Sequence, residues 1–346
     1  MPGPPAAVAV TRLAVRRSLT SRRVAQRSLV LAAVSGGADS LALAAALAFE
    51  GPRAAYDVGA VIVDHGLQPG SGDVAERAAH QCRELGLTSV EVLRVEVAAG
   101  TGQGPEAEAR EARYAALEAA RVRLGASHVL LAHTRDDQAE QVLLGLARGS
   151  GTRSLSGMPR RTATLLRPFL DVTAAETRQA CDDQGLAVWN DPHNADDRYL
   201  RVRVRRLLDD VEQRIGPGVR AGLARSADLL RADGDTLDEL AQSAYGEATA
   251  SREPDALARE SDSRDAVAWV AVAPLADLPT GVRTRVIRLL LLDAGADPAA
   301  LASPQIGWVD DLVMRWKGQG PFDVPGGLRA SREDGRVVVR RAGPLQ

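Results

Sequence analysis

The sequence predicts a doubly wound α/β domain built on a parallel sheet, followed by a smaller, mainly helical domain. Between residues 28 and about 190, short apolar runs alternate with longer segments of helical periodicity, which is typical of a parallel sheet covered by helices. The first and last of these runs are apolar at nearly every position, as strands buried on both faces require. After about residue 210, helical patterns follow one another with little strand signal.

Four strands and three helices account for the first domain. The strands are expected at 28–34, 58–63, 89–95 and 127–132, and the helices at 39–50, 73–85 and 105–124. In the second domain, helices are expected at 219–250, 280–293 and 304–316. Residues 322–341 contain Pro-Gly-Gly and Asp-Gly turns, which predict a small hairpin at the end of the chain.

Charge and turn signals divide the chain into three parts. Residues 1–38 contain six arginines and no acidic residue, so we expect residues 1–25 to form a loose basic arm. The segment Ile215-Gly-Pro-Gly predicts a domain boundary. The arm is therefore followed by an α/β domain at 26–215 and a helical domain at 216–346.

The composition is that of a soluble globular protein. Of the 346 residues, 45% are hydrophobic and 25% are charged, which excludes collagen-like, disordered and disulfide-rich scaffolds. The formal net charge is -2, so a polyanionic partner would need a local basic patch. No apolar stretch approaches the roughly 20 residues that span a bilayer. Cys82 and Cys181 form no CxxC pair and cannot build a zinc site alone, so a cytoplasmic location is expected.

The turn after the first predicted strand has the composition of an anion-binding loop. Its residues are Ser35, Gly36, Gly37, Ala38, Asp39 and Ser40. The loop follows a buried strand and opens a helix, so its backbone N–H groups can point at one phosphate. Neither a following Gly-Lys-Ser/Thr nor a GxGxxG spacing is present, which argues against a Walker A loop and a dinucleotide fold. The alternative is a plain turn in which Ser35 or Asp39 caps the helix.

A second polar cluster follows the fourth predicted strand, at the same edge of the sheet. It contains His133, Asp136, Asp137 and Glu140. On a helix, Asp137 and Glu140 project together from one face, which also carries Gln141 and Leu144. The opposite face, expected to pack on the sheet, consists of Ala139, Val142, Leu143 and Leu146. The alternative is that the acids only cap the helix and complement its dipole, with His133 a satisfied histidine at a strand end.

Five arginines lie within nine residues near the end of the first domain: Arg198, Arg201, Arg203, Arg205 and Arg206. As a helix, the segment has an apolar stripe of Leu200, Val204, Leu207, Leu208 and Val211. The arginines beside that stripe predict a contact with nucleic-acid phosphates. The alternative to a phosphate contact is a solvated face on which the arginines pair with Asp209, Asp210 and Glu212. Because arginine and valine alternate from 201 to 205, the segment could also form a strand in place of a helix.

The hexapeptide at 35–40 resembles the pyrophosphate loop, SGGxDS, of the ATP pyrophosphatases, or PP-loop enzymes. The resemblance implies an adenine nucleotide alpha-hydrolase-like fold. It also implies an enzyme that splits ATP into AMP and pyrophosphate while it adenylates an oxygen. Residues 35–40 would hold the leaving pyrophosphate, with Asp39 near Mg²⁺ or the phosphate end.

Further motifs are similar to those of the lysidine synthetase branch of this family. Residues 132–141 match AHxxDDxxE(T), with Gln141 in place of the final Thr. Residues 108–114 resemble an ARxxRY helix, and residues 190–205 resemble EDPSN followed by YxRNxxR. Asn190, His193 and Val202 depart from that last pattern. Ordered matches cover residues 30–206.

The resemblance assigns roles to individual residues. Asp137 and Glu140 would position Mg²⁺ and the ammonium group of an incoming amine, and Asp39 and Asp137 are the candidate metal ligands. Arg205 would reach the reaction centre. The side chains expected beside the nucleotide are Asp64, His65, Arg113 and His133. Those expected to contact tRNA are Arg198, Arg201 and Arg203.

The implied reaction joins free lysine to the wobble cytidine of a tRNA(Ile) with a CAU anticodon. ATP would adenylate the C2 oxygen of the cytidine, and lysine would then displace AMP to leave lysidine. Residues 26–215 would form the ATP-binding catalytic domain, and residues 216–346 the tRNA-binding domain. Two alternatives stay open. A tRNA thiolase of the same fold would ordinarily need paired cysteines, and a non-catalytic ATP-binding sensor would have no use for the cluster at 133–140.

Overall fold

The structure is a computed structural model that describes residues 3–20, 27–64, 66, 70–95, 105–149, 151–250 and 266–342. The chain divides into two compact units, residues 1–230 and 231–346. The division falls inside a long helix, α9 (Val219–Ala250), and so later in the chain than the expected boundary near residue 215. Among the described residues, no helix is both long enough and apolar enough to cross a membrane.

The first unit contains a five-stranded parallel sheet with the order β3-β2-β1-β4-β5. Its strands are β1 (Leu29–Val34), β2 (Asp57–Asp64), β3 (Ser89–Arg94), β4 (Ala126–Leu130) and β5 (Leu165–Leu166). The four predicted strands are confirmed, and β5 is a two-residue addition at the edge. The strand order reverses beside β1, and ligands of such sheets bind at that point, outside the carboxyl ends of the strands.

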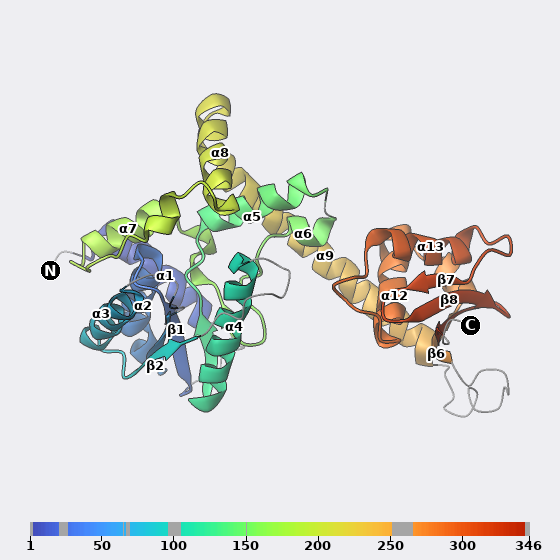
Figure 1. The fold of residues 1–346 in the computed structure, drawn as a ribbon, viewed down its shortest axis with the longest axis horizontal. Helices are drawn as coiled ribbons and strands as arrows, with labels where there is room; N and C mark the ends of the chain where they lie inside the picture. The colour runs from blue at the N-terminus through green and yellow to red at the C-terminus, as the bar shows by residue number, and fades with distance from the viewer. Residues whose placement is uncertain are drawn as a thin grey trace. The chain divides into compact units, whose positions relative to one another are not determined.

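Helices cover both faces of this sheet, as Figure 1 shows for α2 and α3 on one side and α4 on the other. The helices of the unit are α1 (Ala6–Leu19), α2 (Ala38–Arg53), α3 (Ser71–Glu84), α4 (Pro105–Arg123), α5 (Arg135–Ala147), α6 (Thr152–Leu155), α7 (Ala174–Asp182) and α8 (Leu200–Ile215), with 3-10 turns η1 (Pro168–Asp171) and η2 (Pro192–Ala195). Alternate residues of β1 enter two separate cores: Val30 packs with α2, whereas Leu31 packs with Leu117 of α4. The doubly wound class is therefore confirmed.

The N-terminal segment is a packed helix, so the expectation of a loose basic arm is wrong. In α1, Val8, Val15 and Leu19 are buried at helical spacing against α2 and α7. Two of its arginines are engaged within the unit. Arg16 Nε donates to Glu50 Oε2 at 2.8 Å, and the Arg12 guanidinium lies 3.5 Å from the centre of the Phe49 ring. The apolar spacing, not the charge count, decides the structure of this segment.

Helix α8 settles the choice between a helix and a strand for the arginine-rich segment. Val204 and Leu208 are buried against Ala139 of α5. Two members of the predicted apolar stripe, Leu200 and Leu207, are 40% and 51% exposed. The buried face of α8 is therefore narrower than predicted.

The second unit combines helices with a four-stranded antiparallel sheet of order β6-β9-β8-β7. Its elements after α9 are β6 (Ala266–Ala271), α11 (Val272–Ala276), α12 (Thr280–Asp293), α13 (Ser303–Met314), β7 (Phe322–Val324), β8 (Leu328–Glu333) and β9 (Arg336–Arg341). The predicted helices and the terminal hairpin are present, the latter as β8 and β9. Strand β6 was not predicted, because a single apolar run in a helix-rich region carries no alternation that marks a strand.

Candidate active site

The loop between β1 and α2 is held by its own serine hydroxyls. Ser40 Oγ donates to the Gly37 carbonyl at 2.9 Å and accepts the Ser35 backbone N–H at 3.1 Å. Gly37 is the N-cap residue, and no side chain caps α2. The alternative in which Ser35 or Asp39 caps the helix is therefore wrong. The N-terminus of α2 is open to an anion, as a phosphate loop requires.

Gly36 gives this loop its shape. Its φ is +85°, a left-handed conformation that side-chain-bearing residues rarely adopt. Its carbonyl accepts the backbone N–H of Trp189 at 2.9 Å, which ties the loop to the segment after α7.

Asp39 links the phosphate loop to α7 and lies close enough to Asp136 and Asp137 to be affected by their charges. The hydroxyl of Thr177 on α7 donates to Asp39 Oδ1. Burial raises the pKa of Asp39 to about 6. The Thr177 hydrogen bond opposes that rise, the charges of Asp137 and Asp136 add to it, and Arg205 opposes it. The two polar clusters found in the sequence therefore lie close enough to influence one another.

Asp137 caps the helix on which it lies. Thr134 is the N-cap residue of α5, and Asp137 Oδ2 accepts its backbone N–H at 2.7 Å and its hydroxyl at 3.0 Å, which completes a capping box. Asp136 faces elsewhere: its Oδ2 accepts the backbone N–H of Ala174, at the start of α7, at 2.9 Å. The capping interpretation is therefore correct for Asp137 and wrong for Asp136.

Glu140 is a buried acid with one satisfied oxygen. Only 2% of the residue is exposed, and Oε1 accepts Arg205 Nε from α8 at 2.8 Å. No described group forms a hydrogen bond with the buried Oε2. Burial raises the pKa of Glu140, Arg205 opposes the rise and the charge of Asp137 supports it. The structure thus brings Asp137, Glu140 and Arg205 together, as the sequence predicted for the acids.

The division of α5 into two faces is only partly correct. Ala139 and Val142 are buried as predicted, but Leu146 is 50% exposed. Leu143 and Leu144, assigned to opposite faces, both pack against the cluster that α5 forms with α8. Helix α5 is covered from more than one side, so a single sheet-packing face does not describe it.

His133 lies among positive charges and is neutral at physiological pH. Burial and the charges of four arginines lower its pKa to about 3. These arginines, in decreasing order of effect, are Arg167, Arg110, Arg201 and Arg113. They come from the start of η1, from α4 and from α8, so three elements direct positive charge to the edge of the sheet where His133 follows β4. Among the described residues, no group forms a hydrogen bond with the buried Nδ1 of His133.

The five arginines at 198–206 do not form one patch. Arg201 and Arg205 lie one helical turn apart and act on His133 and Glu140. Arg198 precedes α8 and pairs with Asp196, with Nη2 and Oδ2 2.6 Å apart. Arg206 pairs with Asp197, and Arg203 is exposed. The pairing alternative is also partly wrong, because Asp209 and Glu212 pair with Arg220 on α9.

Of the remaining predicted residues, Asp64 and His65, the structure describes Asp64. Asp64 ends β2, is 8% exposed, and accepts the Gly66 N–H through Oδ1 at 2.9 Å. His65 lies outside the described residues. Thr177 and Arg220 were not predicted, because no local motif marks them and their contacts with Asp39 and Asp136 join residues distant in the sequence.

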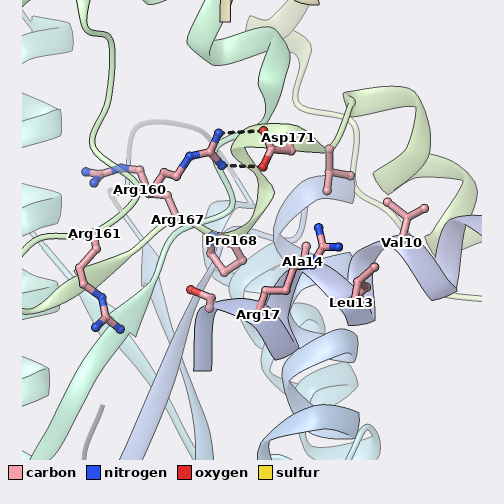
Figure 2. Close-up of a pocket in the computed structure, with 11 residues that line it drawn as sticks. Val10, Leu13, Ala14, Arg17, Arg160, Arg161, Arg167, Pro168 and Asp171 are labelled. Carbon is pink, nitrogen blue, oxygen red and sulfur yellow. Dashed lines mark hydrogen bonds and ion pairs between the residues drawn. The ribbon is translucent and has the colours of Figure 1, made fainter. Parts of the chain in front are cut away.

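A groove of about 750 Å³ lies beside this region, between α1 and residues 160–172 (Figure 2). Leu13, Ala14 and Pro168 contribute apolar surface, and Arg160 reaches across to Asp171 through hydrogen bonds of 2.6 and 2.8 Å. Arg167 is common to the groove and to the surroundings of His133. No residue of the phosphate loop or of α5 lines the groove, so it is distinct from the candidate active site.

Comparison with known proteins agrees with this geometry. Residues 11–211 match the family model of the PP-loop domain, and residues 271–338 match that of the TilS substrate binding domain. The tRNA(Ile)-lysidine synthase of Streptomyces coelicolor is 47% identical over 367 residues, covering 98% of this chain and 99% of that protein. That of Thermobifida fusca is 49% identical over 340 residues, with the same shares covered.

A solved structure shares the fold. The U34-tRNA thiolase NcsA from Methanococcus maripaludis superposes with a TM-score of 0.56 at 19% identity, covering 65% of this chain and 80% of that chain. The match at nearly half identity over almost the whole length is more specific than this likeness. The site geometry, the family models and the relatives lead to one conclusion: the chain belongs to the tRNA(Ile)-lysidine synthase family of PP-loop proteins.

Proposed function

We propose that this protein ligates free lysine to C2 of the wobble cytidine of a tRNA(Ile) with a CAU anticodon. ATP first adenylates the C2 oxygen and releases pyrophosphate, and the lysine amine then displaces AMP. The observation that carries the proposal is that the loop at 35–40 and the polar cluster at 133–140 lie close together. Asp39, in the phosphate loop, lies within the electrostatic influence of Asp137 and of the Arg205 that pairs with Glu140. Triphosphate chemistry and an acidic site for an amine thus share one edge of the sheet.

The phosphate loop holds the leaving pyrophosphate in this proposal. Residues 35–40 present the uncapped N-terminus of α2 and the exposed Ser35 side chain to the anion. Preorganised donors at that position stabilise the charge that develops as pyrophosphate departs. His133, Arg113 and Asp64 line the nucleotide side, where a neutral imidazole can donate or accept a hydrogen bond.

The carboxylates at this edge fit a divalent cation bound together with substrate phosphate. Burial raises the pKa of Asp39 to about 6, and the nearby charge of Asp137 adds to that rise. Mg²⁺ typically takes one or two protein carboxylates and completes its shell with phosphate oxygens and water. Asp39 and Asp137 are the residues that would hold it. The ion would supply neutralisation of phosphate charge during adenylation.

Glu140 and Asp137 are suited to the amine of lysine. Glu140 Oε2 is a buried acceptor without a described hydrogen-bond partner, and an ammonium group would supply the missing donor. Attack requires the neutral amine, so a proton must leave it first. A glutamate whose pKa is raised by burial accepts that proton more readily than an exposed one. Asp137 and Glu140 together position Mg²⁺ and the ammonium group of lysine.

Arginines and the second unit would hold the tRNA. Arg201 lies beside the reaction centre, and Arg198 and Arg203 lie at the surface of the same segment. Residues 271–338 match a substrate-binding domain, which supports a tRNA contact in the second unit. Phosphate contacts of this kind position RNA without reading its sequence.

The thiolase alternative is disfavoured by the two cysteines. Cys82 and Cys181 are both fully buried, and burial raises the pKa of each thiol to about 12. A thiol of that kind is a poor nucleophile near neutral pH. The sensor alternative gives no role to Glu140, whose side chain is 3% exposed and whose charge is costly to bury, although Arg205 beside it is 45% exposed.

The test is a pair of assays on the full chain. Exchange of labelled pyrophosphate into ATP should require tRNA(Ile) but not lysine, and mass spectrometry of the digested tRNA should find lysidine only when lysine is added. Sulfide in place of lysine should give no modified nucleoside. Exchange that is independent of tRNA, or sulfur in the nucleoside, would overturn the proposal.

A further inference from the structure

Arg220, in the first turn of α9, makes four polar contacts with two other helices. Its Nη2 lies 2.9 Å from Asp209 Oδ1 and donates to the Arg205 carbonyl at 3.1 Å. Its Nη1 lies 3.0 Å from Glu212 Oε2, and its Nε forms an ion pair with Asp136 Oδ1 at 3.1 Å without a hydrogen bond. The side chain is 14% exposed. One guanidinium is therefore shared by three acids and a carbonyl.

The helices that Arg220 joins are those that carry the proposed amine site. Asp136 is in the first turn of α5, the helix of Glu140, and the other contacts are on α8, the helix of Arg205. The apolar contact between α5 and α8 contains three buried residues, Ala139, Val204 and Leu208, and Leu143 and Leu144 of α5 are partly buried against them. Because apolar attraction is non-directional, the directional restraint of α8 must come from polar contacts. The ionic contacts supply that restraint.

Asp136 extends the same connection to the phosphate loop. Its second oxygen accepts the Ala174 N–H and so fixes the start of α7. One turn later on α7, Thr177 donates to Asp39. The carboxylate of Asp136 thus lies between Arg220 on one side and the helix that orients Asp39 on the other.

We propose that Arg220 is a positioning residue for the lysine side of the reaction centre, which it serves by holding α8 so that Arg205 reaches Glu140. This inference rests on the proposed function, because it concerns the site assigned to lysine. Without Arg220, three acids remain near one another with no shared cation, and their repulsion separates α8 from α5. The ATP side depends less on Arg220, because Ser35 and Ser40 hold that loop through contacts of their own and the bond from Ala174 to Asp136 does not involve Arg220.

The first experiment compares steady-state kinetics of three variants with wild type. Arg220→Met removes the charge and keeps the length, Arg220→Lys restores one cation without the planar fork, and Arg225→Met is a control at an exposed position of the same helix. We expect Arg220→Met to raise KM for lysine about tenfold or more while KM for ATP stays within about twofold. Arg220→Lys should recover part of the loss, and Arg225→Met should match wild type.

The second experiment is a double-mutant cycle of Asp136→Asn and Arg220→Met on KM for lysine. If the two side chains act through their contact, the double variant should be no worse than Arg220→Met. If Arg220→Met does not fold, as judged by circular dichroism, Asp136→Asn and Arg220→Lys take its place, and each should raise KM for lysine alone.

Three results would overturn the inference: equal rises of KM for lysine and ATP, an Arg220→Met variant that matches Arg225→Met, or additive effects in the cycle. These are distinct from failure of the proposed function. A wild-type protein that forms no lysidine refutes the function itself, whereas a wild type that forms lysidine with no lysine-specific effect at Arg220 refutes only the positioning role.

Discussion

At the scale of single residues, Asp137 serves structure and chemistry with the same carboxylate. It closes the capping box of α5 with Thr134, and its charge adds to the burial that raises the pKa of both Asp39 and Glu140. The sequence offered capping and chemistry as alternatives, because a single acidic side chain near a helix start fits either. The helical spacing correctly predicted that Asp137 and Glu140 lie together. It could not predict Thr177, whose contact with Asp39 spans 138 residues.

Substitution of the acids of α5 separates their roles. We expect Asp137→Asn and Glu140→Gln to lower turnover by about a hundredfold, the usual cost of removing one aimed charge, and Asp136→Asn to lower it less, because Asp136 faces Ala174 and Arg220. The amide oxygen in Asp137→Asn can still accept the Thr134 N–H, so the melting temperature of this variant should fall only slightly. Initial rates and thermal melts of the three variants test this. Equal losses at all three positions would contradict the face argument.

The raised pKa of Asp39 predicts a pH-dependent gain in stability for Asp39→Asn. The pKa of about 6 in the folded protein lies above the ordinary 3.8, so the folded state binds the proton more tightly than the unfolded state. Ionised Asp39 therefore destabilises the fold, by nothing below about pH 4 and by up to about 3 kcal/mol above pH 6. The variant should melt higher than wild type at pH 7.5 and by a smaller margin at pH 4.5. A margin that grows on acidification would refute the burial argument.

The same Asp39 variant should lose adenylation and keep tRNA binding. The loop at 35–40 is proposed to contact triphosphate and not RNA, and Ser40→Ala should behave similarly because Ser40 holds the loop through Ser35 and Gly37. Pyrophosphate exchange and filter binding of tRNA measure the two properties. Parallel losses of affinity and exchange would show that the loop serves both substrates.

At the scale of elements, burial on both faces made β1 and β4 predictable, whereas no residue of the equally predicted β3 is fully buried. Strand β5 was not predicted, because two residues are too few to show a periodic pattern. Helix α1 was not predicted, because its arginines suggested a loose arm although Val8, Val15 and Leu19 have helical spacing. For α8 the sequence left helix and strand open. The choice depends on packing against Ala139 of α5, which is a tertiary contact. Local pattern therefore predicted the element types where one face or both faces are uniformly buried.

The helical form of α8 predicts different effects for its arginines. Arg201→Ala should weaken tRNA binding and reduce the slope of log affinity against log salt by up to about one unit. Arg205→Ala should lower turnover more than affinity, because Arg205 pairs with Glu140. Arg214→Ala, at an exposed position in the last turn of α8, is the control. The measurement is tRNA affinity across a salt series for each variant. An unchanged slope for Arg201→Ala would mean that Arg201 lies on a solvated face and does not contact tRNA phosphate.

At the scale of the whole molecule, the chain has two units with separate cores. The sheet of the first unit is covered on both faces, and the second unit packs its antiparallel sheet on α12 and α13, with Ala241 of α9 in the same core. The total charge of -2 gave no sign of an RNA substrate, because a net charge does not show where positive charge gathers locally, as it does around His133. The two-domain organisation was visible in the change of pattern after residue 210, but the exact division was not, because α9 continues through it.

The placement of sulfur and indole gives each unit its own reporter of unfolding. Both cysteines are buried in residues 1–230, whereas three of the four tryptophans, Trp269, Trp308 and Trp316, belong to residues 231–346. Alkylation should therefore stay blocked until the first unit opens, while fluorescence mainly follows the second. We expect saturating ATP to delay alkylation, by about 2.7 kcal/mol of opening free energy at a hundred times its Kd, and to leave the fluorescence transition in place. A joint shift of both signals would mean that the two cores melt as one.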